Sequence, residues 1–66
     1  MNKSAIRSNF QQYLEGKLSY HKTNFALLLE SPRPIPEHTD FMEAMQTELE
    51  KVAHYHELLE VVETGV

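Results

Sequence analysis

The hexapeptide Ser31-Pro32-Arg33-Pro34-Ile35-Pro36 divides the 66-residue chain into two halves of similar length. Each of its three prolines lacks a backbone N–H and disfavours helix in the residue before it, so this stretch cannot be helical. Neither flanking segment contains a proline. We therefore expect a stiff Pro-rich loop over residues 31–36, with one regular element on each side of it.

The segment before the loop has the periodicity of an α-helix. Its main row of residues advances in steps of 4, 3, 4 and 3, and two further apolar residues extend it toward the N-terminus, which strand alternation does not fit. Gly16 costs about 1 kcal/mol relative to alanine in a helix interior and could break the segment. Because the row keeps its phase across Gly16, we expect one continuous helix over about residues 3–30. The residues of the row are Ile6, Phe10, Leu14, Leu18, His21, Phe25 and Leu28.

The segment after the loop follows a heptad pattern and predicts a second helix over about residues 37–63. Steps of 3, 4, 3, 4 and 3 separate the members of this row, as in the a and d positions of a coiled coil. Its start is less sharply defined, because Pro36 suits a first helical position while Asp40 and Glu43 have capping-box-like spacing. The members of the row are Met42, Met45, Leu49, Val52, His56 and Leu59.

The predicted fold is all-α, an antiparallel helical hairpin forming a single domain over residues 1–66. A second apolar row lies beside the heptad row on the second helix, and one partner helix cannot cover so wide an arc. Short folds without cysteine also need another source of stability, and this chain has no cysteine. We therefore expect two hairpins to pair into a dimeric four-helix bundle. The second row adds Phe41, Tyr55 and Val62 to the interface residues expected from the two rows above, and Leu58, which lies off the main row in the last turns, is expected there too.

Charge divides the chain along the same boundary. The net charge is −4, but residues 1–29 carry +3 and residues 30–66 carry −7. Side-by-side packing of two complementary halves explains this asymmetry, and a basic half that meets nucleic acid is the alternative. The basic residues Lys3, Arg7, Lys17 and Lys22 fall within about 140° on a helical wheel. Their arc overlaps the apolar row, which disfavours a nucleic-acid face. Lys17 is expected to pair with Glu48 or Glu60.

The histidines suggest a third possibility, a metal or small-molecule site within the bundle. His54 and His56 are about 200° apart on a helix and cannot chelate one metal together. His21 and His56 each fall on an apolar row, where a histidine at the edge of the core with one hydrogen bond is the commoner arrangement. We therefore predict no metal and no cofactor. The three tyrosines, Tyr13, Tyr20 and Tyr55, are expected in the core.

Enzymatic chemistry has no support in this sequence. There is no cysteine nucleophile and no glycine-rich phosphate loop, and a chain this short cannot form a dry active-site pocket alone. The first residues lack a signal peptide, and the longest apolar run, residues 25–29, is far too short to span a membrane. The sequence predicts a cytoplasmic, non-enzymatic protein–protein interaction module, a regulator or adaptor acting as a homodimer.

Overall fold

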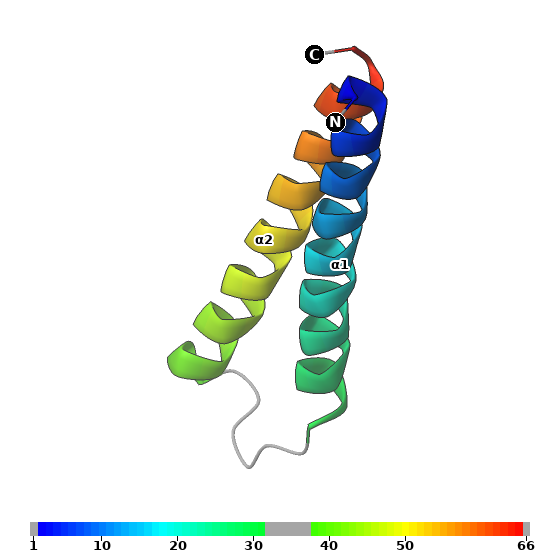
Figure 1. The fold of residues 1–66 in the computed structure, drawn as a ribbon. Coiled ribbons are helices and arrows are strands. Elements are labelled where there is room, and N and C mark those ends of the chain that lie inside the picture. The colour runs from blue at the N-terminus through cyan, green and yellow to red at the C-terminus, as the bar shows by residue number, and fades with distance from the viewer. Residues whose placement is uncertain (1, 32–37, 66) are drawn as a thin grey trace.

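Two long helices pack side by side in the computed structural model, which describes residues 2–31 and 38–65. Helix α1 spans Lys3–Glu30 and α2 spans Thr39–Glu63. They run antiparallel, so the start of α1 lies beside the end of α2, and they diverge toward the connection between them (Figure 1). The whole is a rod of 53 × 15 × 13 Å. The all-helical hairpin predicted from the sequence is therefore confirmed, while residues 32–36 of the predicted loop lie outside the described residues.

Helix α1 runs without interruption through Gly16, as the phase of its apolar row predicts. A Cβ added at Gly16 would meet no atom within 4 Å, so this glycine serves no close approach. Asn2 caps the helix: its Oδ1 accepts a hydrogen bond of 2.7 Å from the backbone N–H of Ala5. At the other end, the Ser31 hydroxyl donates to the Leu27 carbonyl. Both helix termini thus have partners for backbone groups that an isolated helix leaves unpaired.

Helix α2 begins two residues after the start predicted from the proline pattern. Its N-cap is His38, whose Nδ1 accepts a 3.2 Å hydrogen bond from the backbone N–H of Asp40. At the C-terminus, the Thr64 hydroxyl donates to the Glu60 carbonyl. Gly65 follows with a φ of +108°, a conformation that glycine adopts without the steric cost other residues meet after a helix.

The face of α1 that meets α2 is the central part of the predicted row. Leu14 is only 1% exposed, and Leu18, His21, Phe25 and Leu28 are half-buried. Ile6 and Phe10, predicted to extend this row, are exposed instead. The reason is geometric: they precede Leu14 in steps of four, and each such step rotates a residue about 40° around the helix.

The face of α2 differs from the predicted heptad row. Met45, Val52 and Leu59 do lie on it, but Met42, Leu49 and His56 are exposed. The second apolar row supplies the remaining contacts, together with Glu48. This face of α2 half-buries the aromatic side chains of Phe41 and Tyr55. It also brings the Glu48 carboxylate into the contact, where side chains of α1 donate hydrogen bonds to it. The half-buried or buried members of this face are Phe41, Ala44, Met45, Glu48, Val52, Tyr55, Leu58, Leu59 and Val62.

The hydrophobic core of this hairpin is small. Among the described residues, Leu14 and Leu59 are the only buried hydrophobic residues, one on each helix. Neither described helix is long and apolar enough to cross a membrane. Because only these two leucines are buried, the hairpin alone leaves many of its large apolar side chains in contact with solvent.

Candidate interaction surface

Aromatic rings from both helices form a continuous group at the middle of the hairpin. The ring of His21 stacks on that of Tyr55 across the two helices, with centroids 5.8 Å apart and planes 9° apart. Tyr20 packs edge-on against His21 at 5.0 Å, and His54 packs edge-on against Tyr55 at 5.3 Å. His21 and Tyr55 are half-buried, whereas Tyr20 and His54 are exposed. The group thus leads from the contact between the helices out to the surface.

A polar contact accompanies this group. Nδ1 of His21 lies 2.6 Å from Oε2 of Glu48, and the Asn24 amide donates to the same oxygen at 3.3 Å. Because an ionised carboxylate only accepts hydrogen bonds, Nδ1 of His21 carries the donated proton. The hydrogen bond from His21 is the main cause of a lowered pKa for Glu48, and that from Asn24 acts in the same direction against partial desolvation.

His21 therefore behaves as predicted for a histidine at the edge of the core, with its hydrogen bond made. Glu48, expected as a partner of Lys17, is paired with His21 instead. The Lys17 ammonium lies 5.7 Å from the centre of the Tyr13 ring, a cation–π distance. Lys17 is half-buried beside the contact face, and its charge meets an aromatic ring where a carboxylate was expected.

A row of large exposed side chains runs along one flank of α1. Tyr13 and Tyr20 are 55% and 60% exposed, which corrects their predicted place in the core. Leu27 continues the row after a further seven residues, and Ile6 begins it seven residues before Tyr13. Residues spaced by seven share one side of a helix to within about 20°. We call this surface, with Phe10 beside it, the tyrosine face.

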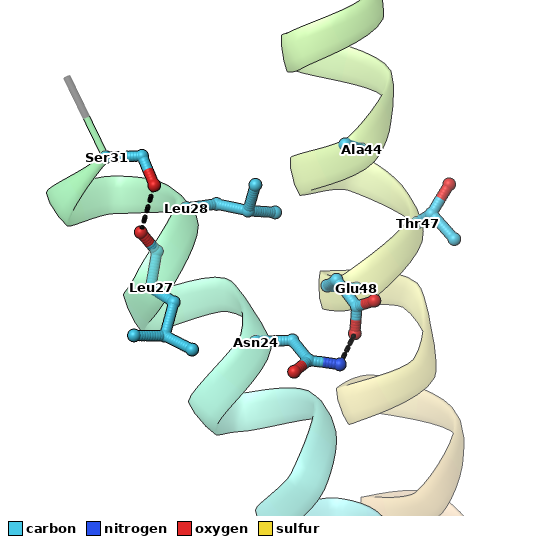
Figure 2. A pocket seen from close by; sticks show the side chains of 7 residues that line it. All are labelled: Asn24, Leu27, Leu28, Ser31, Ala44, Thr47 and Glu48. Carbon is cyan, nitrogen blue, oxygen red and sulfur yellow. Dashed lines mark hydrogen bonds between the residues drawn. The ribbon is translucent and has the colours of Figure 1, made fainter. Parts of the chain in front are cut away.

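A pocket shows which side of α2 borders the tyrosine face. It has a volume of about 460 Å³ and lies between the helices near the connection, where Figure 2 shows its lining side chains. Leu27 of the tyrosine face lines it together with Ala44 and Thr47 of α2, and a hydrogen bond joins two further lining residues, Asn24 and Glu48. By heptad spacing, Lys51 and then Leu58 follow Ala44, and His54 and then Val61 follow Thr47, along the same flank of α2. Around the pocket this flank carries the small side chains of Ala44 and Thr47, whereas Lys51, His54 and Leu58 farther along it are large.

The other predicted interface residues on α2 lie on its opposite flank. Met42, Leu49 and His56 are spaced by seven, and all three are exposed in the single chain. Leu49 is 52% exposed. The nearest described partner of His56 is Glu60 on its own helix, at 3.7 Å. These three members of the predicted heptad row thus lie on the flank of α2, while the other three lie in its contact with α1.

The basic residues do not cluster around a single feature of the structure. Lys3, Arg7 and Lys22 are exposed, while Lys17 is half-buried beside Tyr13. Lys3, Lys17 and Lys22 form no ion pair with any described residue. The nucleic-acid alternative therefore rests on sequence charge alone.

The histidines also remain apart as potential ligands. His21 is held by Glu48, His54 by the Tyr55 ring, and His56 lies beside Glu60. In residues 2–31 and 38–65, no three histidine, aspartate or glutamate side chains come close enough to hold a metal ion.

Sequence reasoning missed the tyrosine face, although its signal was present. Positions 6, 13, 20 and 27 keep a strict spacing of seven, but tyrosine suits both a core edge and a surface. The chain matches no family model, no curated protein and no solved structure. Its function is therefore inferred from the geometry above.

Proposed function

We propose that this chain is a small, non-enzymatic protein–protein interaction module, a regulator or adaptor that acts as a homodimer of two hairpins in a four-helix bundle. The observation that carries the proposal is the tyrosine face. Five large apolar or aromatic side chains lie exposed along one helix of a very small protein: Ile6, Phe10, Tyr13, Tyr20 and Leu27.

Exposure of such a row is unfavourable for a monomer. Soluble monomers rarely expose contiguous apolar patches beyond a few hundred Å², and patches of that size commonly mark interaction sites. Tyrosine is moreover enriched at protein interfaces, because it contributes apolar area and a polar group together. The hairpin buries few residues of its own, so a partner on this face also supplies the stability that a short fold lacks.

Sedimentation of the 7.7 kDa chain tests the proposal. At micromolar concentration we expect a species of twice the chain mass, and a monomer with full helicity would contradict the proposal. The chain offers a matched pair of variants in Leu27 and Leu29, which are 57% and 61% exposed on the same helix.

Leu27→Glu places a charge on the tyrosine face, and Leu29→Glu places the same charge about 200° away around α1. We expect Leu27→Glu to shift the protein toward monomer and Leu29→Glu to leave the association unchanged. Circular dichroism on both variants checks that the helices persist. Equal association of the two variants would mean that the tyrosine face is not the interface.

A further inference from the structure

The surface area of the hairpin matches what one member of a dimer would expose before association. The chain has an accessible surface of 5195 Å², whereas a compact monomer of this mass has roughly 4,300 Å². The surplus of roughly 900 Å² is close to the share of one partner in a standard interface, about 800 Å². The chain therefore exposes more surface than a compact monomer of its mass, by about the area that one partner contributes to a standard interface.

Two closed arrangements bring the tyrosine faces of two hairpins together. A two-fold axis across the rod places α1 on α1 and α2 on α2 of the other copy. A two-fold axis along the rod instead places α1 of each copy on α2 of the other, and neighbouring helices are antiparallel in both arrangements. Both are isologous contacts, so symmetry alone does not choose between them.

The net charges of the two helices favour the two-fold axis along the rod. Helix α1 carries four basic and two acidic side chains, for a net +2, whereas α2 carries one basic and seven acidic side chains, for a net −6. Packing like helices together sets −6 against −6, while packing unlike helices sets +2 against −6. Lys3 and Lys17, which flank the tyrosine face on α1, form no ion pair with the described residues of their own chain.

Side-chain size around the pocket also favours the two-fold axis along the rod. The tyrosine face on α1 is bulky, whereas the flank of α2 beside it carries Ala44 and Thr47 around the pocket. Large side chains opposite small ones fill space between helices, whereas small opposite small leaves a void. A two-fold axis along the rod leaves every residue at the same position along the rod in both copies. Leu27 of one copy therefore lies level with Ala44 and Thr47 of the other.

We propose that the tyrosine face binds a second copy of this chain with α1 of each hairpin packed on α2 of the other, about a two-fold axis parallel to the rod. This inference rests on the proposed homodimer and specifies its geometry. It predicts that both N-termini lie at one end of the bundle and both connections at the other. It also predicts that Leu27 of one copy covers the pocket between the helices of the other copy.

Distance measurement between two spin labels tests this geometry, and the absence of native cysteine permits a single labelled site per chain. Ser4→Cys labels one end of the rod, and Ser19→Cys labels its middle. Both serines are exposed on α1 and lie off the tyrosine face. Sedimentation of each labelled variant verifies that it associates as the unlabelled protein does.

With the axis along the rod, the two Ser4 labels lie at the same end and within roughly 30 Å, since neighbouring helices in a bundle lie about 8–10 Å apart. With the axis across the rod, they lie at opposite ends and roughly 40 Å or more apart, given a rise of about 1.5 Å per residue. The Ser19 labels lie close together in both arrangements and report the dimer itself.

The outcomes separate this inference from the proposed function. Short Ser4 and short Ser19 distances support the proposed geometry. Long Ser4 distances with short Ser19 distances overturn it while leaving the homodimer intact. Monomeric protein, with no distance between labels, overturns the homodimer and this inference together.

Discussion

His21 and Glu48 join the two helices at the middle of the hairpin, with Nδ1 of the histidine 2.6 Å from Oε2 of the carboxylate. The side chains are 15% and 21% exposed, so water competes only in part for this contact. Polar residues at such positions commonly fix the register of packed helices. Here the contact brings Glu48 against α1 in the row of α2 that also contains Tyr55, on which His21 stacks.

The first prediction concerns the acid stability of this contact. The hydrogen bond from His21 lowers the pKa of Glu48 below its ordinary value of 4.5. Between the two values the unfolded state binds more protons, so stability is full above pH 4.5 and declines as pH falls through the lowered pKa. We expect Glu48→Gln to destabilise the protein at pH 7, and the difference from wild type to shrink toward pH 3.

Urea denaturation at fixed protein concentration measures this difference. Glu50→Gln, at an exposed position of the same helix, is the matched control and should follow the wild type across the same pH range. A Glu48→Gln deficit of equal size at pH 7 and pH 3 would show that the ionised carboxylate is not its source.

The second prediction concerns Gly16, which lies in the interior of α1 with open space around its missing side chain. Alanine has the higher helix propensity by about 1 kcal/mol in a helix interior. We therefore expect Gly16→Ala to raise the free energy of unfolding by about that amount without changing the oligomeric state. A loss of stability would contradict this prediction, and would indicate that another molecule packs closely against Gly16, which lies between Tyr13 and Tyr20 beside the tyrosine face.

The sequence predicted the two helices and the contact face of α1 well, because each follows from a short-range pattern. Three prolines interrupt the helical periodicity, and the α1 row through Leu14 and His21 has one dominant phase. The row on α2 was harder to assign. Its two candidate rows share Val52 and Leu59 and differ by one residue in phase, with His56 in one and Tyr55 in the other.

The choice between those rows depends on α1, which a pattern within α2 does not contain. Tyr55 faces inward because His21 offers a ring for it to stack on, and Glu48 faces inward because His21 and Asn24 donate to it. A polar residue within an otherwise apolar row argues against that row as the contact face only when no hydrogen-bond partner for the residue is known. The tyrosine face was missed for the same reason, because a pattern within α1 does not show which side of that helix α2 covers.

The last prediction compares two leucines that the sequence alone placed on equivalent rows. Leu14 is 1% exposed and lies against α2, whereas Leu49 lies on the flank of α2 away from the tyrosine face. Truncating a buried leucine to alanine removes apolar burial and leaves a cavity, at a cost of about 2–5 kcal/mol. A surface substitution away from such contacts changes stability by only about 0.5 kcal/mol. We therefore expect Leu14→Ala to abolish or severely weaken cooperative unfolding and Leu49→Ala to resemble wild type, measured by urea denaturation at one protein concentration because dimerisation contributes to stability. A large loss from Leu49→Ala in a protein that still dimerises would place the subunit interface on the flank of Met42 and Leu49, and would exclude the tyrosine face as the site of pairing.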